Sequence, residues 1–148
     1  MIVISHAKKT DVISIASLEE IIFSDAMHAH VLEDAVENNL FLVAHKDDEI
    51  IGYFLGQCVL DEMEILRIAV SPNYRRMGYG RLLLNAARQK AIERGIVHCY
   101  LEVRESNNSA ISLYKSFDFL QYGRRSRFYR QPDEDAILMK AQWGVEKL

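Results

Sequence analysis

The stretch ILRIAVSPNYRRMGYGRLLL, residues 65–84, decides the fold of this chain. Residues 65–70 are almost all apolar, which predicts a buried strand. The turn formers Ser-Pro-Asn at 71–73 end this strand, and Gly78 and Gly80 then lead into a helical pattern. A glycine-bearing loop at the start of a helix presents free backbone N–H groups at the positive end of the helix dipole. The sequence therefore predicts an anion-binding loop, with phosphate as the first candidate ligand.

The chain before this stretch alternates between strand and helix patterns. Apolar residues recur at helical spacing from Thr10, a possible N-cap, to about Phe23. Two apolar runs, residues 40–44 and 50–56, flank the short charged turn at 46–49 and predict a hairpin. We expect the remaining elements of this half to be a strand at 2–5, an amphipathic helix at about 29–36, and a strand that follows Asp61-Glu62 and ends near Val70.

The chain after the loop continues the same alternation. A helix is predicted from Gly78 to Arg94, because Gly95 follows as a C-terminal stop. Asn107 is a cap residue for a short helix that contains Tyr114. Strands at 97–103, 119–127 and 135–141 complete the pattern. The order is that of an α/β protein with a mixed sheet, in which a right-handed strand–helix–strand unit frames the loop.

Length, composition and charge limit the classes of protein to consider. With 148 residues and 49% hydrophobic composition, the chain can bury a sizeable core, and we expect a single domain over residues 1–148. A net charge of −3 offers no basic surface for direct nucleic-acid binding. No apolar run is long enough to span a membrane and no leader pattern is seen, so we expect a cytoplasmic protein without a membrane partner. Cys58 and Cys99 lie in apolar stretches and are expected to be buried thiols.

The loop at Arg75–Gly80 does not match the common nucleotide-binding motifs. It lacks the third glycine of the dinucleotide motif and the Gly-Lys-Ser/Thr ending of a triphosphate-binding loop. Its Arg-x-x-Gly-x-Gly spacing, after Ile-Ala-Val-Ser-Pro at 68–72, resembles the pyrophosphate-binding motif of the GNAT superfamily of acetyl-CoA-dependent N-acetyltransferases. Taken alone, these six residues are also compatible with two glycines that ease an ordinary strand-to-helix turn.

Neighbouring segments extend the resemblance over roughly residues 61–139. Tyr-Leu-Glu-Val-Arg at 100–104, followed by the pattern N-x-x-A-x-x-L-Y at 107–114, matches the next motif of that superfamily. The closing residues 134–139 are similar as well. The order and spacing most resemble the bacterial ribosomal-protein-alanine N-acetyltransferase family. The resemblance implies a mixed, mostly antiparallel sheet flanked by helices, with a central strand–helix–strand site for acetyl-CoA.

The resemblance also implies roles for individual residues. Glu102 is the expected proton acceptor for the amine, Tyr114 the proton donor to the CoA thiolate, and Asn107 a contact to the CoA arm. The expected acetyl-CoA contacts from the strand and the loop are Ile68, Ala69, Val70, Arg75, Arg76, Met77, Gly78, Tyr79, Gly80 and Arg81. From the residues alone, Glu102 also fits an ion-paired surface glutamate and Tyr114 an aromatic core residue. No metal is expected, since His28 and His30 are two residues apart and do not share a helix face.

The acceptor amine is less determined than the cofactor. An α-amine has a pKa of ~7.8 against ~10.4 for lysine, so making it neutral at pH 7 costs roughly 3.5 kcal/mol less. The leading hypothesis is transfer to a protein N-terminus, with the alanine of a ribosomal protein as first candidate. Residues 23–30 lack the Pro-Trp element that usually shapes the peptide site of this family. A small-molecule amine, a lysine and a non-catalytic CoA-binding regulatory module stay as alternatives, and we expect a monomer or a homodimer.

Two further features carry expectations about the last third of the chain. Asp118 stands where the family pattern has glycine, a position that commonly needs a left-handed backbone conformation. A cluster of basic residues between the last strands is expected to be a solvated basic edge, with an acidic peptide or a CoA phosphate as the alternative partner. The cluster consists of Arg124, Arg125, Arg127 and Arg130.

Overall fold

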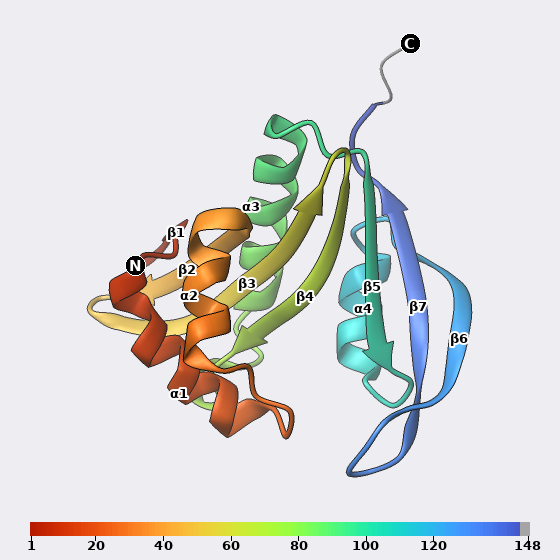
Figure 1. The fold of residues 1–148 in the computed structure, drawn as a ribbon, viewed down its shortest axis with the longest axis horizontal. Coiled ribbons are helices and arrows are strands. Elements are labelled where there is room, and N and C mark those ends of the chain that lie inside the picture. Colours follow the sequence, from red (N-terminus) through yellow and green to blue (C-terminus); the bar gives the residue numbers. More distant parts are fainter. Residues whose placement is uncertain (146–148) are drawn as a thin grey trace.

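The computed structural model describes residues 1–145, whose strands form one sheet in the order β1-β2-β3-β4-β5-β7-β6 (Figure 1). The strands are β1 Ile2–His6, β2 Leu40–Lys46, β3 Glu49–Val59, β4 Glu62–Val70, β5 His98–Arg104, β6 Leu120–Tyr129 and β7 Glu134–Gln142. The helices are α1 Val12–Ile22, α2 Ala29–Asn38, α3 Tyr79–Glu93 and α4 Asn108–Lys115. Short 3-10 turns cover Lys9–Asp11 and Pro72–Tyr74. Within this described part of the chain, no helix is long and apolar enough to cross a membrane.

Neighbouring strands of the sheet are antiparallel, with one exception. Only β4 and β5 run parallel to each other. Parallel neighbours need a crossover connection, and α3 provides it between the end of β4 and the start of β5. The predicted α/β class, the mostly antiparallel sheet and the strand–helix–strand unit around the loop are thereby confirmed.

Each face of the sheet carries its own core, and the two cores differ in how many strands they cover. On one face α3 and α4 bury Leu83, Leu84, Ala87, Tyr114 and Phe117 against the sheet residues Phe54, Ile65, Leu101 and Met139. On the opposite face, α1 and α2 bury Ile15, Leu18 and Leu32 against Phe41, Val43 and Tyr53. Figure 1 shows α1 and α2 over β2 and β3. In the described chain the second face of β5, β7 and β6 therefore has no helix on it.

Of the predictions for two local positions, Thr10 and Asp118, only the second is confirmed. The N-cap prediction for Thr10 is wrong, because Thr10 lies inside the 3-10 turn and α1 begins only at Val12. The turn is held instead by Asp11, whose carboxylate accepts a hydrogen bond from the backbone N–H of Lys8 at 2.8 Å. The left-handed conformation predicted for Asp118 is confirmed, with φ of 72°.

Candidate active site

The candidate site lies where β4 and β5 diverge (Figure 1). Their parallel pairing joins Glu62–Ile65 to His98–Leu101 and goes no further. Residues 67–70 continue to pair with β3, but among the described residues they have no ladder partner on the β5 side. A strand edge of this kind leaves backbone N–H and C=O groups free for another molecule. Ile68, Ala69 and Val70, the predicted strand contacts to acetyl-CoA, lie on this free edge.

A β-bulge at Leu66 marks the start of the divergence. Leu55 pairs with Arg67 and Gly56 pairs with Ile65, so Leu66 is an extra residue in β4. A bulge turns the residues that follow it toward the other face of a sheet. Arg67 consequently points toward α1 instead of toward the α3 core. Gly56 suits the position opposite the bulge, because a Cβ there would lie 2.5 Å from the sulfur of Met63.

The predicted anion loop has the geometry of an open backbone cradle. Arg76 has φ of 62° and Gly78 has φ of 81°, so two of its residues are left-handed. The first helical bond of α3 joins the N–H of Leu82 to the carbonyl of Gly78 at 3.1 Å. The N–H groups of the three residues before Leu82 are therefore free of helical partners. They lie at the positive end of the helix dipole, where a diphosphate is stabilised.

The two glycines of the loop serve different purposes. Gly78 adopts a conformation that side chains rarely tolerate, and a Cβ there would meet no atom within 4 Å. Gly80 has no positive φ, and a Cβ there would make only an ordinary contact, 3.5 Å from Cδ2 of Leu113. Packing within the protein therefore does not require glycine at position 80. The space in front of this backbone is open, which fits a ligand that approaches closely, as the diphosphate of acetyl-CoA would.

Only some of the predicted cofactor-binding side chains form hydrogen bonds within the described protein. Arg75 donates its Nε–H to the carbonyl of Val70 at 3.3 Å, which closes the loop back onto β4. Arg81 donates to the hydroxyl of Ser116 at 3.1 Å. Arg76 and Met77 are exposed. Arg75 and Arg81 are also exposed, but their guanidinium groups bind other parts of the protein, whereas no described residue binds the guanidinium of Arg76.

Asn107 lies at the N-terminus of α4, as the sequence pattern predicted. Its side-chain oxygen accepts a hydrogen bond from the N–H of Ala110 at 3.2 Å and so caps the helix. The amide nitrogen of the same side chain makes no hydrogen bond to the described protein residues. That N–H₂ group is the part of Asn107 that remains available to a ligand.

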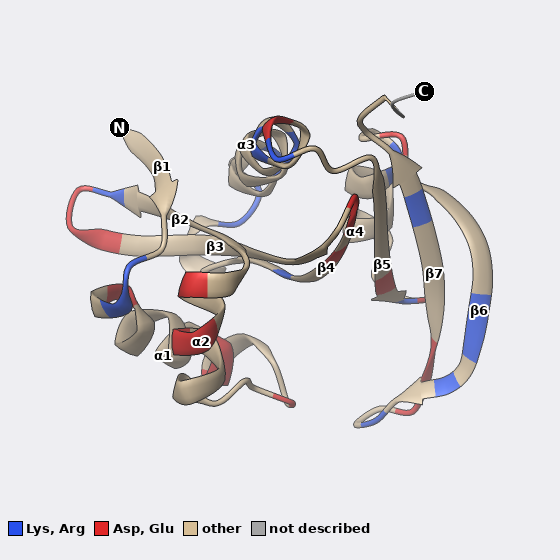
Figure 2. Ribbon diagram, turned by 45° about the horizontal axis from the view of Figure 1, so that its top comes forward, with Lys and Arg blue, Asp and Glu red and all other residues tan. Residues whose placement is uncertain are grey.

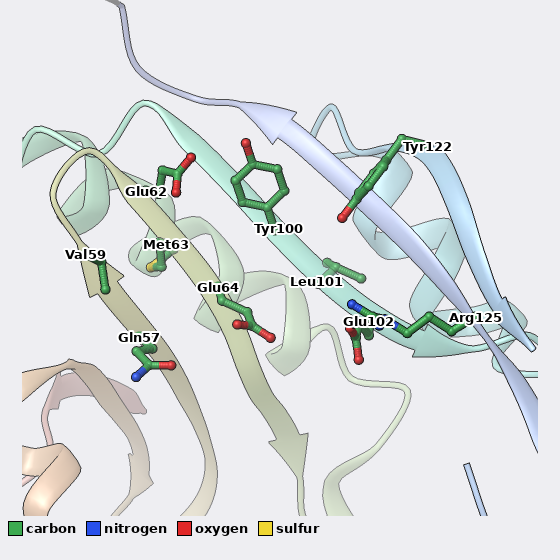
Figure 3. A pocket seen from close by; sticks show the side chains of 10 residues that line it. All are labelled: Gln57, Val59, Glu62, Met63, Glu64, Tyr100, Leu101, Glu102, Tyr122 and Arg125. Atoms are coloured by element: carbon green, nitrogen blue, oxygen red, sulfur yellow. Dashed lines mark hydrogen bonds and ion pairs between the residues drawn. The ribbon is translucent and has the colours of Figure 1, made fainter. Parts of the chain in front are cut away.

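Glu102 lies directly after Leu101, the last residue of β5 that pairs with β4, and faces an open groove (Figure 3). Its carboxylate accepts a hydrogen bond from Nε of Arg125 at 3.0 Å, and the side chain is 25% exposed. The groove is lined by Gln57, Val59, Glu62, Met63, Glu64, Tyr100, Leu101, Glu102, Tyr122 and Arg125. Glu102 is thus an ion-paired glutamate, and it also lies at the divergence of the two strands.

Tyr114 is a core residue whose hydroxyl nevertheless reaches a surface. Its ring packs edge-on against Phe119, with ring centres 5.7 Å apart, and burial raises the pKa of the hydroxyl above its usual value. The hydroxyl has no hydrogen-bond partner among the described residues. Among the described residues, every fully enclosed side-chain oxygen has a hydrogen-bond partner. Because the hydroxyl of Tyr114 has none, it is not fully enclosed. Tyr114 is therefore an aromatic core residue, and its role as a proton donor stays a prediction.

Tyr129, the last residue of β6, is a site residue that the sequence pattern did not single out. Its pKa is raised to about 12, mainly by burial and next by the carboxylate of Glu102. Tyr129 in turn contributes to the raised pKa of Tyr114. The guanidinium of Arg104 lies 4.6 Å from the centre of its ring. Tyr129 is therefore within electrostatic reach of both predicted proton carriers, and its only signal in the sequence is an aromatic pair with Phe128.

The basic edge of β6 is largely neutralised by carboxylates. Figure 2 shows the basic residues along β6 with acidic residues on neighbouring segments. Three of the four arginines form ion pairs: Arg124 with Glu105 and Asp135, Arg125 with Glu102, and Arg130 with Asp133. The fourth, Arg127, donates its backbone N–H to Asp135. Among residues 1–145, no group of three or more His, Cys, Asp or Glu side chains is placed to hold a metal ion.

Comparison with known proteins agrees with this geometry. The model of the acetyltransferase (GNAT) family matches residues 10–119. The [ribosomal protein bS18]-alanine N-acetyltransferase of Salmonella typhimurium is 43% identical over 103 residues, which cover 68% of this chain and 68% of that protein. The enzyme of the same name from Haemophilus influenzae is 38% identical over 106 residues, covering 70% of this chain and 72% of that protein.

The fold is matched over almost the whole chain by a solved structure. The crystal structure of the ribosomal-protein-S18-alanine N-acetyltransferase from Escherichia coli superposes with a TM-score of 0.92 and 31% identity, covering 99% of this chain and 97% of that one. The matched region includes the free edge of β4, the loop before α3 and the start of α4. The chain therefore belongs to the acetyltransferase (GNAT) family, as the motifs around Arg75–Gly80 and Glu102–Tyr114 indicated.

Proposed function

We propose that this acetyltransferase moves an acetyl group from acetyl-CoA to the N-terminal α-amine of a protein, with the alanine of a ribosomal protein as the first candidate acceptor. The observation that carries the proposal is the free edge of β4 beside the open N-terminus of α3, with Glu102 at the divergence of the strands. The relatives support the choice of acceptor, because their names describe enzymes that acetylate the alanine of ribosomal protein bS18.

Acetyl-CoA supplies the activated acetyl group, and the chain offers matching contacts for its parts. The N–H groups of residues 79–81 and the guanidinium of Arg76 would hold the diphosphate. The backbone of Ile68–Val70 would pair with the pantetheine arm and would place a donor near the thioester oxygen, where negative charge develops. The side-chain N–H₂ of Asn107 would bind the same arm from α4.

Two side chains of this chain would manage the protons. Glu102 takes the proton of the incoming ammonium, directly or through a water molecule, while its other carboxylate oxygen stays paired with Arg125. The neutral amine nitrogen then bonds to the acetyl carbon as the carbon–sulfur bond breaks, and it releases a second proton to solvent as the amide forms. Tyr114 gives its hydroxyl proton to the departing thiolate. Burial keeps this hydroxyl protonated at neutral pH, since it raises the pKa of Tyr114.

The first experiment asks whether the purified protein transfers acetyl groups to α-amines. It would be incubated with acetyl-CoA and peptides that begin with alanine, serine or methionine, and with an N-terminally blocked peptide that contains lysine. Mass gain and release of the CoA thiol are read together. Acetylation confined to free α-amines supports the proposal, whereas transfer only to lysine, or to polyamines in a parallel reaction, overturns the choice of acceptor.

A matched pair of variants separates an enzyme from a regulatory module that only binds CoA. We expect Glu102→Gln and Tyr114→Phe to bind acetyl-CoA as tightly as the wild type does but to lose most of the transfer activity. Binding of acetyl-CoA without transfer in the wild type, over the whole panel of amines, would favour the regulatory module.

A further inference from the structure

Glu19 of α1 is the one fully buried charged residue among those described, with an exposed fraction of 0%. Its carboxylate accepts three kinds of hydrogen bond: from the hydroxyl of Tyr53, from the backbone N–H of Met27 at 2.8 Å, and from Nε of Arg67 at 3.2 Å. A buried carboxylate is strongly unfavourable without such partners. The network therefore fixes the positions of all three partners, which come from β3, from the α1–α2 loop and from β4.

Arg67 extends the same network along the α1–α2 loop, residues 23–28. Its Nη2 donates to the backbone carbonyl of Asp25 at 3.0 Å and lies 3.3 Å from the carboxylate of Asp25. Its guanidinium also lies 4.1 Å from the ring centre of Phe23. Arg67 and Glu19 together thus contact the beginning, the middle and the end of the loop, through Phe23, Asp25 and Met27.

The bulge in β4 explains why Arg67 can do this. Arg67 precedes Ile68 to Val70 on the free edge that is proposed to hold the acetyl-CoA arm. Because Leu66 is an extra residue, Arg67 points to the α1 face, while Ile68 packs on the α3 side. The arginine joins the strand of the acetyl-donor site to a loop on the other face of the sheet.

The loop also lies near the groups that would handle the acceptor. Asp25 and Arg67 both affect the pKa of Tyr129, Asp25 raising it and Arg67 lowering it. Tyr129 belongs to β6, on the far side of the divergence, and is influenced by Glu102 as well. The carboxylate of Asp25 is 73% exposed, whereas the side chain of Arg67 is only 14% exposed. The largely buried side chain of Arg67 therefore holds the exposed side chain of Asp25 in place, and Arg67 directly precedes the free edge of β4.

We propose that Arg67, braced by Glu19, is a positioning residue that holds the α1–α2 loop through Asp25 and thereby selects the acceptor. The proposal rests on the acetyl-transfer function above and adds which part of the chain recognises the acceptor. Residues 23–28 take the place of the Pro-Trp element expected for the family, and here a charged clamp to β4 orders this loop. The loop should therefore affect the binding of the acceptor and leave acetyl-CoA binding unchanged.

Steady-state kinetics of three variants test this proposal. Asp25→Ala removes the exposed partner without touching the buried pair, and Arg67→Lys keeps a cation for Glu19 but loses the forked contact to Asp25. We expect each to raise KM for the acceptor peptide by about tenfold while KM for acetyl-CoA stays within about twofold. Asp48→Ala is the matched control, since Asp48 is an exposed carboxylate in the turn between β2 and β3, lies outside residues 23–28 and contacts neither Glu19 nor Arg67. Its KM values should equal those of the wild type.

The double variant Asp25→Ala/Arg67→Lys separates positioning from general destabilisation. Because both single changes break the same contact, the double variant should raise KM for the peptide little more than either one does. Equal increases of both KM values, or a fall in thermal stability with no change in KM, would overturn the positioning role.

The same variants distinguish failure of this inference from failure of the proposed function. If the wild type acetylates an amine other than a peptide N-terminus, the proposed acceptor is wrong, and KM for that amine takes the place of KM for the peptide. An unchanged KM for whichever acceptor is used would overturn the inference alone. Absence of transfer to any amine would overturn both.

Discussion

Tyr114 combines a buried ring with a hydroxyl that no described residue binds. Tyr114→Phe should therefore leave the core intact and change the free energy of unfolding by less than about 1 kcal/mol, because no intramolecular hydrogen bond is lost. If the hydroxyl protonates the thiolate, kcat should fall by about 10²-fold or more, while KM for acetyl-CoA is retained. Urea denaturation and initial rates check the two halves of this prediction. An unchanged kcat would remove Tyr114 from the mechanism.

The raised pKa of Tyr114 predicts the pH dependence of the reaction. A proton donor works below its pKa, and burial moves this pKa upward from the usual value of about 10. We therefore expect kcat with saturating substrates to show no alkaline decline between about pH 8 and pH 10. A decline in that range for the wild type would mean that the donor has an ordinary pKa and is another group.

Gly80 and Gly78 should respond differently to the same small change. Gly80→Ala places a methyl group in the open space before α3, so we expect acetyl-CoA to bind about tenfold or more weakly while the fold is unaffected. Gly78→Ala forces a side chain into a left-handed conformation and should cost stability of about 1 kcal/mol as well as affinity. Gly95→Ala, at φ of 84° beyond the other end of α3, is the control that should lose stability alone. Calorimetric titration and thermal unfolding separate the three.

The sequence pattern was most informative about residues whose neighbours in the chain define their environment. Asn107 was predicted as a cap and is one, since capping needs only the N–H of Ala110 three residues later. Glu19 was missed because it lies in an apolar helical pattern and its partners are Tyr53 and Arg67, far along the chain. The spacing of nearby residues cannot predict a buried carboxylate whose hydrogen-bond partners lie far along the chain.

At the scale of elements, the β3–β4 pair depends on a close approach opposite the bulge. A Cβ at Gly56 would lie 2.5 Å from the sulfur of Met63 and 3.0 Å from the ring of Phe54, both fully buried. Gly56→Ala should therefore destabilise the protein by about 1–3 kcal/mol through overpacking. Gly123→Ala is the matched control in β6, where the nearest atom would be Cδ1 of Leu138 at 3.3 Å. Urea denaturation of both should show a clear loss only for Gly56→Ala.

Local patterns predicted almost every helix and strand, but not where two strands part. Alternation and turn residues are properties of one segment, so the helix at Tyr79–Glu93 and the hairpin of β2 and β3 follow from them directly. The divergence of β4 and β5 depends on how two distant segments twist against each other. The bulge at Leu66 has a faint signal in the sequence: Ile65 and Leu66 are two consecutive apolar residues directly before Arg67, which simple alternation does not explain.

At the scale of the whole molecule, helices cover the sheet asymmetrically, and the candidate site lies where the cover by α1 and α2 ends. The core of α1 and α2 reaches β4 only through Leu66 and Ala69, while the core of α3 and α4 extends to β7. Beyond these two residues, β4 and β5 are therefore packed against helices on one face only. The acetyl donor and the acceptor can then approach the divergence from opposite faces of the sheet, which direct transfer between two bound substrates requires.

Alkaline pH should destabilise the molecule as a whole, because the pKa values of three buried side chains, Tyr53, Cys99 and Tyr114, are all raised in the folded state. Burial raises the pKa of Cys99 to about 12 and raises the pKa values of Tyr53 and Tyr114 above the usual range. In the unfolded chain these groups ionise near their ordinary values of about 8.5 for cysteine and about 10 for tyrosine. Above those values the unfolded state loses protons that the native state keeps, so the free energy of unfolding falls as pH rises.

This direction of change predicts how the free energy of unfolding varies with pH. The free energy of unfolding should be level near pH 7–8, begin to fall at about pH 9 with Cys99, and fall more steeply above about pH 10, each group contributing a slope of up to about 1.4 kcal/mol per pH unit. Urea denaturation at intervals from pH 7 to pH 11 measures it. Tyr114→Phe should flatten the part above pH 10 by the slope of one group, because phenylalanine has no proton to lose. A wild-type curve that stays level to pH 11 would show that these side chains ionise in the native state as easily as in the unfolded one.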